Sequence, residues 1–540
     1  MTTDVVIAGG GPNGLLLACE LALAGVHPVL LERLPERAAA PKANGLVGRV
    51  VQALDYRGLY ERFTGQAAPP VPVPGFQFAA LPLDLAALDH NALYALPIPQ
   101  RRMEELLEQR ARELGAEIRR GHELTAVSQT ADEVTAGVQG PDGPYQLTAK
   151  FLVGADGGHS IVRKGCGIDF PGVTDRGFVS RSGQVTIPPP VAVPGTGELD
   201  VPGAGRLRPA TFTRTENGMF AYGMFQPGLY RVAVYEWAPS PLEDAASMPL
   251  EELRAAVRRV IGGDVPMSEP GGGEPSALRR SAGANSRQAE RYRHGRVFLA
   301  GDAAHVHSGV GGPGLNLGLQ DVLNLRWKLA AAVSGWAPEG LLDTYQSERH
   351  PVGQRVIMQT RAQAALLSPG ANVTALRDLF GELLREPATV AHIADLMAGA
   401  DVRYDTRGDG PGHAMAGKWM PDLGLRTGSG RTRVAELLRP ARAILLSLTA
   451  RTDLVPAAQG WRDRIDVITA TTSEPPADAI LIRPDGYVAW AAGAGEPGAA
   501  DGLRRALRTW FGEPASVVNS DGAAREPALA LPDRGQPPLR

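Results

Sequence analysis

The glycine motif near the N-terminus most constrains what this chain can fold into. A short apolar segment, Asp4–Ala8, runs into Gly9-Gly10-Gly11-Pro12-Asn13-Gly14, and an apolar run, Leu15–Leu23, follows directly. A second apolar segment ends at Glu32. This order predicts strand, tight turn, helix and strand, the arrangement in which a helix N-terminus binds a pyrophosphate. The N-terminal region is therefore predicted to be a dinucleotide-binding unit.

Each position of the motif has an expected role. Gly9 permits the turn, Gly11 lets the backbone approach the pyrophosphate, and Gly14 allows the helix to pack closely on the strand. Pro12 and Asn13 lie between these glycines and belong to the same candidate cofactor site. A GxGxxG pattern alone is weak evidence in a chain with 65 glycines. The flanking strands and helix make the prediction specific.

An acidic residue ends the second predicted strand. Glu32 follows the glycines by about 20 residues, where an acid can accept hydrogen bonds from ribose hydroxyls. Its neighbour Arg33 has two interpretations: it contacts the adenosine, or it is a solvated surface charge. The sequence leaves both open.

Composition points to a large enzyme. A length of 540 residues suggests roughly two to four domains. A net charge of −3, without a run of Lys or Arg, argues against a nucleic-acid partner. The two cysteines, Cys19 and Cys166, form no CxxC pair, so we expect neither a disulfide framework nor a metal site. The first predicted strand starts at residue 4 without a basic, apolar leader. We therefore expect a protein that is neither exported nor membrane-spanning. The two unpaired cysteines suit a reducing cytoplasm, and the expected state is a monomer or a homodimer.

A later glycine-rich segment carries the most chemistry. Residues 295–300 form a predicted buried strand that ends in Gly301-Asp302, and the segment Gly311–Asn316 then opens a helix. Asp302 can accept from the hydroxyls of a ribityl chain. A helix N-terminus facing a flavin stabilises the negative charge that two-electron reduction places on the ring. Alone, this is an ordinary strand-to-helix loop; together with Gly9–Gly14 it indicates FAD.

A third signature lies between these two. Asp156 follows the predicted buried strand that begins at Phe151, and Ser160 and Arg163 come after it at helical spacing. An acid in this position caps the next helix.

The remaining pattern divides the chain into segments. A Pro-rich bridge at Pro69–Pro74 leaves the first unit, and β-type alternation runs from about residue 170 to 280. The expected helices are Val47–Leu59, Gln100–Leu114, Leu315–Ala332 and Leu341–Leu367. The expected segments are 1–75, 99–169 and 286–400 (three parts of an FAD-binding domain), 76–98 (substrate-domain strands), 170–285 (a substrate-binding domain), 401–525 (a small α/β module) and 526–540 (a disordered tail).

These motifs resemble a known class of enzymes over nearly the whole chain. With Leu342–Pro351 they are similar to the class A FAD-dependent, NAD(P)H-using flavoprotein monooxygenases. Within this class the chain looks most like the aromatic polyketide hydroxylases, on the segments Val297–Ala330, His413–Asp422 and Ile482–Tyr487. That group acts on tetracycline- and angucycline-type intermediates and includes rifamycin-modifying enzymes. The resemblance implies an α/β fold: a Rossmann-like FAD-binding domain with an inserted β-sheet substrate domain, as in para-hydroxybenzoate hydroxylase, and a C-terminal thioredoxin-like domain without redox cysteines.

The same resemblance implies roles for individual residues. Gly301 and Asp302 would bind the ribityl chain, and Asp156 would serve both FAD and nicotinamide. Arg49 would lie near the flavin. The other residues implied to contact FAD are Gln100 and Arg102, near the ribityl and phosphate region, and Pro313, Gly314, Leu315 and Asn316, beside the isoalloxazine. Arg102 also has a surface-charge interpretation.

The chain departs from the family pattern at two positions. Gly309 stands where the family usually has Pro, and Pro313 where it commonly has Gln or Leu. Gly309 is expected to loosen the loop over the flavin, and Pro313 fixes φ at the helix start.

The implied reaction follows from the cofactor. NADPH or NADH reduces FAD, O₂ adds at flavin C4a, and the hydroperoxide hydroxylates an aromatic polyketide. A Baeyer–Villiger oxidation, an oxygen-free oxidation or cyclisation, and a non-catalytic flavoprotein remain alternatives. No residue of 170–285 receives a catalytic role from its type and spacing.

Overall fold

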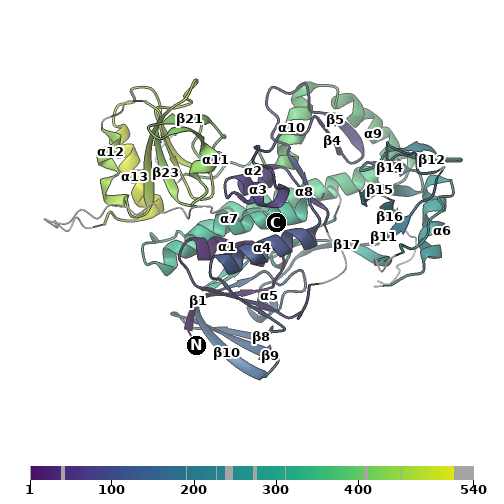
Figure 1. Cartoon of the computed structure of the whole chain (residues 1–540), viewed down its shortest axis with the longest axis horizontal. Helices are drawn as coiled ribbons and strands as arrows, with labels where there is room; N and C mark the ends of the chain where they lie inside the picture. Colours follow the sequence, from purple (N-terminus) through teal and green to yellow (C-terminus); the bar gives the residue numbers. More distant parts are fainter. Residues whose placement is uncertain are drawn as a thin grey trace, which may run out of the picture.

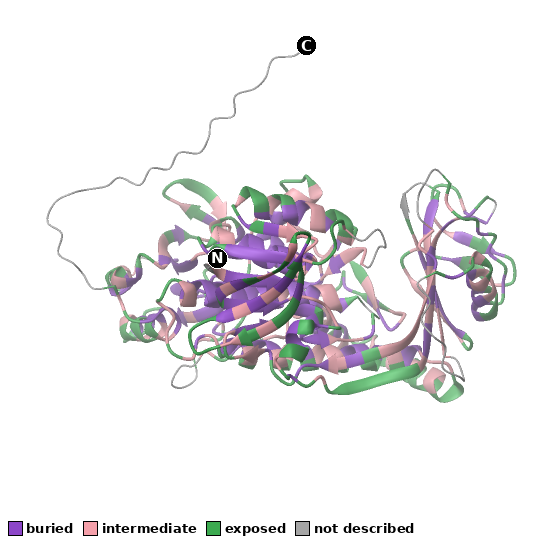
Figure 2. Cartoon of the chain, turned by 90° about the horizontal axis from the view of Figure 1, so that it is seen from below, coloured by how far each residue is buried: buried purple, intermediate pink, exposed green. Residues whose placement is uncertain are grey.

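The computed structural model describes residues 2–37, 43–189, 191–226, 228–237, 247–271, 276–309, 312–406, 412–449, 451 and 453–515. The predicted tail, 526–540, lies outside these residues. Within these residues, three large mixed or antiparallel sheets with their helices make up most of the molecule, and three two-stranded sheets accompany them (Figure 1). Buried residues gather in the central body and along the strands of the lobe on the right of Figure 2.

The first sheet contains the N-terminal strand and has eight strands. Its strands β1 (Thr2–Ala8), β2 (Pro28–Glu32), β7 (Glu117–Arg120), β10 (Gly143–Gly154) and β19 (Val297–Leu299) run parallel. An antiparallel hairpin, β8 (Glu123–Gln129) and β9 (Val134–Gly140), extends β10, and β18 (Arg293–His294) lies at the other edge. Segments distant in sequence thus form one sheet, as a nucleotide-binding domain assembled in several parts requires.

Three helices cover one face of this sheet (Figure 1). They are α1 (Pro12–Leu23), α4 (Gln100–Glu113) and α7 (Pro313–Val333), and α1 contacts both others. A fourth long helix, α8 (Thr344–Leu367), contacts α7. The expected helix Val47–Leu59 is instead two short helices, α2 (Arg49–Asp55) and α3 (Leu59–Thr64). The break falls at Gly58, whose φ of 67° is left-handed and ends a helix.

The second sheet is antiparallel and forms most of a separate lobe. Its order is β14 (Phe212–Thr215), β15 (Gly218–Gln226), β16 (Leu229–Trp237), β11 (Gly172–Thr186), β17 (Arg279–Gln288) and β20 (His305–Val306). Helix α6 (Leu250–Ile261) packs against β15 and β16, beside the hairpin β12 (Leu199–Val201) and β13 (Gly205–Leu207). Because β20 follows Gly301-Asp302 closely, the lobe is joined directly to the predicted flavin loop.

Two small antiparallel pairs of strands lie outside the large sheets. One is the ladder of β3 (Gly45–Val47) with β6 (Ala95–Pro97), and the other is the hairpin of β4 (Gly75–Phe78) and β5 (Leu81–Asp84). Helices α9 (Ala371–Leu383) and α10 (Pro387–Ala398) follow α8, and side chains from these helices and from the β4–β5 hairpin share one apolar cluster. A short helix, α5 (Ile161–Gly165), follows β10.

The C-terminal module has thioredoxin-like topology. Strands β23 (Ala443–Ser447) and β24 (Ile465–Thr471) are parallel, β25 (Ala479–Ile482) and β26 (Val488–Ala492) continue antiparallel, and α13 (Ala499–Phe511) closes the unit. Short helices α11 (Val434–Leu437) and α12 (Leu454–Ala457) accompany the sheet. A polar hairpin, β21 (Gly424–Thr427) and β22 (Gly430–Arg433), adds two edge strands that the sequence did not predict.

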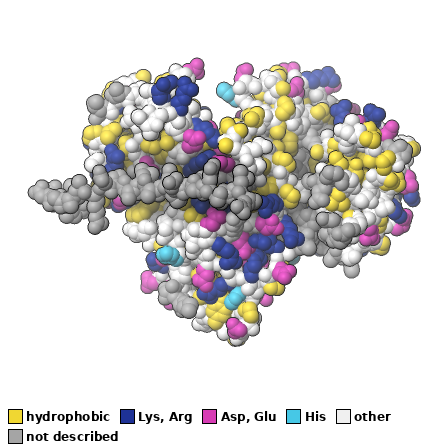
Figure 3. Space-filling model, in the orientation of Figure 1, with side chains coloured by type: hydrophobic (Ala, Val, Ile, Leu, Met, Phe, Trp, Pro, Cys, Tyr) yellow, Lys and Arg dark blue, Asp and Glu magenta, His cyan; other side chains and the backbone are white. Residues whose placement is uncertain are grey.

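Two features relevant to binding partners are the distribution of surface charge and the apolar character of the helices. On the face seen in Figure 3, Lys and Arg side chains are intermixed with Asp and Glu. Within the described ranges, no helix combines the length and apolar character needed to cross a bilayer.

Candidate active site

A cleft of about 1160 Å³ runs past the carboxyl ends of β1, β2 and β10. In open α/β sheets, ligands bind at this edge. Eleven of the predicted cofactor residues line it: Gly9, Gly11, Pro12, Asn13, Glu32, Arg33, Gln100, Asp156, Asp302, Gly314 and Leu315. Residues far apart in sequence therefore meet in one cavity.

The three signatures touch one another. Gly9 has a φ of 108°, and a Cβ there would lie 2.3 Å from the carbonyl oxygen of Ala155, next to Asp156. Gly301 has a φ of 61°, and a Cβ there would lie 1.9 Å from Nδ2 of Asn13. Only glycine fits either position without moving its neighbour. The turns after β1, β10 and β19 are thus packed against each other.

The N-terminus of α1 opens onto the cleft. Gly11 is the N-cap residue, Pro12 occupies the first turn, and no acidic side chain lies in that turn. The free N–H groups of the helix start and the positive end of its dipole suit a pyrophosphate. Gly14 is buried one turn into the helix, behind the cleft wall.

Glu32 is held by the backbone at the end of β2. The N–H of Gly10 donates to Oε2 of Glu32 over 2.6 Å, and the N–H of Leu34 donates to Oε1 over 2.9 Å. A carboxylate has about four acceptor sites, so capacity remains for ribose hydroxyls. Arg33 lines the cleft beside it, which favours its adenosine interpretation over a purely solvated charge.

Asp156 caps a helix, as its position suggests. Oδ2 accepts from the N–H groups of Ile161 (2.7 Å) and Val162 (3.1 Å), while Ser160 accepts from the N–H of Arg163 (2.9 Å). The other carboxylate oxygen, Oδ1, is buried and has no hydrogen-bond partner within the described part of the chain. One oxygen of Asp156 is therefore committed to structure and one is not.

The Gly301-Asp302 turn presents Asp302 to the cleft. Gly301–Ala303 form a single 3₁₀ turn in which Gly301 is buried and Asp302 is exposed. Asp302 and Gly314 both line the cavity, so the turn and the start of α7 face the same space.

Two further predicted residues shape the cleft from behind. Pro313 is buried at the start of α7. Asn316 is 6% exposed; its Oδ1 accepts from the N–H of Val47 (3.1 Å) and its Nδ2 donates to the carbonyl of Gly312 (3.0 Å). Asn316 therefore links β3 to Gly312, the residue that precedes α7, and does not itself line the cavity.

Arg102 and Arg49 do not line the cleft. The side chain of Arg102 is 59% exposed and pairs with Glu105 (3.3 Å). Gln100 does line it, and two residues along an α-helix point about 200° apart, so the two side chains cannot face one cavity. Arg49 donates to Oε1 of Gln52 (3.0 Å), and its guanidinium lies 5.7 Å from the ring centre of Trp419. The surface interpretation of Arg102 is the one the geometry supports.

The sequence did not single out His307, which lines the cleft. Burial lowers the pKa of His307 to about 4, so the ring is neutral at pH 7. A Cβ at Gly314 would lie 3.3 Å from its Cε1, so the small residue at 314 leaves room for the ring. No pattern of residue types marks His307 in the sequence, because only the fold brings it to the cleft while its neighbour His305 turns to buried Asp321.

The residues fit FAD. Asn13 Oδ1 and Asp156 Oδ1 are buried without a partner inside the described ranges, both belong to cleft-lining residues, and native structures seldom leave such atoms unpaired. Donors at the α1 N-terminus, an acid after β2 and an acid at Asp302 are the groups that pyrophosphate, ribose and ribityl chain require.

Comparisons with known proteins agree with this geometry. The FAD binding domain family matches residues 2–360, and the C-terminal family of aromatic-ring hydroxylases matches 413–514. The chain is 44% identical to the 12-dehydrotetracycline 5-monooxygenase/anhydrotetracycline 6-monooxygenase of Streptomyces rimosus, over 95% of this chain and 100% of that protein. It is 38% identical to the dialkyldecalin synthase of Streptomyces rugosporus, over 95% and 99% respectively.

A solved structure gives the same result. The anhydrotetracycline hydroxylase OxyS from Streptomyces rimosus matches with a TM-score of 0.83 at 42% identity, covering 95% of this chain and 100% of that one. The resemblance read from the motifs is confirmed, and so is the fold it implied. The chain belongs to the class A FAD-dependent monooxygenases, the family of aromatic-ring hydroxylases built on this FAD binding domain.

Proposed function

We propose that this chain hydroxylates a polycyclic aromatic polyketide in antibiotic biosynthesis, using FAD, O₂ and NADPH or NADH. One observation carries the proposal: the cleft lined by the predicted FAD-binding residues is also lined by Phe76 of the β4–β5 hairpin and Phe212 of the antiparallel lobe. Aromatic side chains there suit a flat ring system. Relatives named for tetracycline-type and rifampicin substrates support the substrate class.

The chain's own residues would bind and orient the reactants. The α1 N-terminus, Glu32 and Asp302 would hold FAD along the cleft, and bound FAD supplies the activation of O₂. His307, Gly309 and Gly314 line the same cleft and would lie beside the reacting end, where neutral His307 adds no charge. The apolar wall would exclude water from the oxidation.

The setting of the reaction is part of the proposal. A cytoplasmic location fits the need for NADPH or NADH and the two free cysteines. Size-exclusion chromatography with light scattering would decide between a monomer and a homodimer.

A second candidate function rests on Gly309, which stands where the family usually has proline. Gly309 lines the cleft, is exposed, and has no heavy atom within 4 Å of where a Cβ would stand. The space that a proline ring would fill is open, and the relative from Streptomyces rugosporus is named a synthase. An oxygen-free oxidation or cyclisation, or a Baeyer–Villiger oxidation, is therefore the alternative.

An isotope experiment separates these functions. The purified FAD-loaded enzyme is given NADPH, ¹⁸O₂ and anhydrotetracycline, and the products are analysed by mass spectrometry. Hydroxylation predicts one ¹⁸O atom on a ring carbon, and Baeyer–Villiger chemistry predicts it in a lactone or ester. A changed product that carries no ¹⁸O would reject both oxygenase functions in favour of the oxygen-free one. Flavin that neither NADPH nor NADH reduces in the presence of the substrate would likewise reject both oxygenase functions.

A further inference from the structure

The end of the cleft away from the nucleotide-binding glycines is built from three separate segments. Phe76, Gln77 and Ala79 belong to the β4–β5 hairpin, Ala210 and Phe212 to the antiparallel lobe, and Gln363 to α8. The amide of Gln77 joins the first two, because Nε2 donates to the carbonyl of Ala210 (3.2 Å) and Oε1 accepts from the N–H of Phe212 (3.2 Å). Both ends of the Gln77 side chain are therefore used by the protein.

Gln363 differs from Gln77 in having one free end. Its side chain is 1% exposed, and Oε1 accepts from the N–H of Ala79 over 3.2 Å. Nε2 is buried and has no hydrogen-bond partner in the described part of the chain. The chemistry fixes this orientation, since an N–H group can bond only to the amide oxygen. The donor end of Gln363 is the unsatisfied one.

The Ala79 turn holds Gln363 in place. Ala79 has a φ of 50°, a conformation that residues with a side chain rarely adopt. Its carbonyl accepts from Nη1 of Arg377 (2.6 Å), which also donates to the carbonyl of Leu366 on α8 (2.9 Å). Rotating the Gln363 amide would leave the Ala79 N–H without its acceptor. Gln363 lines a largely apolar end of the cleft, and its free Nε2 is thus a donor whose orientation the protein fixes in advance.

We propose that Gln363 determines substrate specificity by donating a hydrogen bond from Nε2 to an oxygen on a planar ring system. That oxygen is a phenol, phenolate or ring carbonyl, the acceptors that an oxygenated polycyclic substrate carries on its edge. The inference rests on the proposed function and names a residue through which that substrate is recognised. A buried donor left unpaired disfavours binding of an analogue without the oxygen, so one side chain discriminates between substrates.

Two substitutions separate recognition from structural support. Gln363→Glu keeps an oxygen to accept from the Ala79 N–H but replaces the donor with an acceptor. Gln363→Met, of similar volume, removes both. Gln359→Met is the matched control, because Gln359 lies one turn earlier on α8, is 3% exposed and does not line the cleft. Each FAD-loaded protein is titrated with anhydrotetracycline and with 1,8-dihydroxyanthraquinone, following flavin fluorescence, from pH 6 to pH 9.

The expected result is a Kd raised about tenfold in both Gln363 variants and unchanged in Gln359→Met, at equal flavin content. In Gln363→Glu the loss should grow with pH, because a protonated carboxyl can still donate and an ionised one repels the acceptor. Wild-type affinity of Gln363→Glu across the whole pH range would overturn the inference and leave the proposed function intact. Failure of wild-type enzyme to bind either probe would overturn the proposed function and the inference with it.

Discussion

Oδ2 of Asp321 lies 2.6 Å from Nε2 of His305, and both side chains are completely buried. The same oxygen accepts from the N–H of Gly301 (3.4 Å), and Oδ1 accepts from Nε of Arg349 (2.8 Å). Burial by itself raises the pKa of Asp321, but Arg349 and His305 hold it below its ordinary value. One carboxylate thus fixes both ends of the turn that presents Asp302.

Replacing Asp321 with Asn should therefore weaken FAD binding and the fold together. The substitution keeps the shape but leaves the Arg349 guanidinium buried without its counter-charge, a change that costs about 3–5 kcal/mol. We expect a lower denaturation midpoint and a reduced ratio of flavin to protein after purification. Asp343→Asn is the control, because Asp343 is 71% exposed and pairs with Arg293 at the surface. Full flavin content in Asp321→Asn would show that the turn does not depend on this carboxylate.

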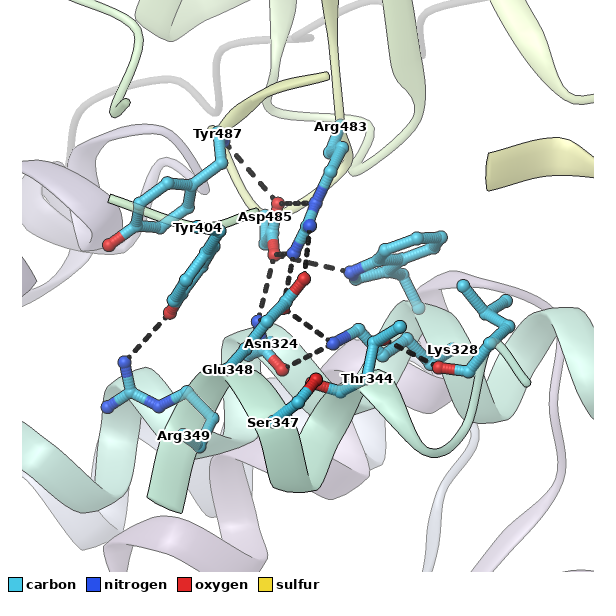
Figure 4. A network of polar contacts seen from close by, with 12 residues as sticks. Asn324, Lys328, Thr344, Ser347, Glu348, Arg349, Tyr404, Arg483, Asp485 and Tyr487 are labelled. Atoms are coloured by element: carbon cyan, nitrogen blue, oxygen red, sulfur yellow. Dashed lines mark hydrogen bonds and ion pairs between the residues drawn. The ribbon is translucent and has the colours of Figure 1, made fainter. Parts of the chain in front are cut away.

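A second buried network joins the C-terminal module to the FAD-binding part (Figure 4). Arg483 donates from Nη1 and Nη2 to the two oxygens of Glu348 over 2.6 and 2.8 Å, and from Nε to Asp485 over 3.1 Å. Lys328 donates to Glu348 from α7 over 2.7 Å. Arg349, next to Glu348 on α8, donates to the hydroxyl of Tyr404 over 2.9 Å. The β25–β26 connection is therefore held by charges from both long helices.

Arg483→Met should destabilise the protein strongly. Arg483 is 1% exposed, and its loss removes the hydrogen-bonded counter-charge that buried Glu348 and Asp485 share. Breaking a buried ion pair in this way costs about 3–5 kcal/mol. Urea unfolding followed by tryptophan fluorescence measures the loss. Arg504→Met, which removes an exposed pair with Asp501, should change stability by less than about 1 kcal/mol. Equal midpoints for the two variants would contradict the prediction.

The lowered pKa of His307 predicts that the folded protein loses stability in mild acid. Its folded-state pKa of about 4 lies below the ordinary value of 6.5, so the unfolded chain binds more protons between these values. Stability that is complete above pH 6.5 should therefore fall as pH drops toward 4, by at most about 3 kcal/mol from this residue. Unfolding free energies of wild type and His307→Gln, measured from pH 7 to pH 5, test this. Identical pH slopes would show that the His307 ring is not the cause.

Much of the cofactor site could be predicted because local backbone rules fix it. Gly9, Glu32 and Asp302 each stand at a strand end, where spacing alone determines the direction of a turn or side chain. The prediction for Arg102 was wrong about its direction, because helical periodicity turns it away from the face that carries Gln100. The polar hairpin β21–β22 was missed since its short, charged strands lack an apolar pattern.

The substrate end of the cleft could not be predicted from local pattern. The orientation of the Gln363 side chain depends on its hydrogen bond to the N–H of Ala79, 284 residues earlier in the chain, and no local pattern announces that contact. Asp321 likewise reads as one polar position of a helix until the fold brings His305 and Arg349 to it. Long-range pairing of polar groups in the core leaves no periodic signal.

Asp302→Ala is the most direct test of the cofactor assignment. Asp302 is exposed on its turn and lines the cleft, so its removal should leave the fold intact while FAD loses a hydrogen-bond acceptor for its ribityl hydroxyls. We expect the variant to purify with little flavin and with a denaturation curve like that of wild-type protein stripped of FAD. Arg102→Ala provides the comparison, because the pair Arg102–Glu105 lies outside the cleft and its loss should leave flavin content unchanged. A fully yellow Asp302→Ala protein, or a colourless Arg102→Ala protein, would reverse the roles that the geometry gives these two residues.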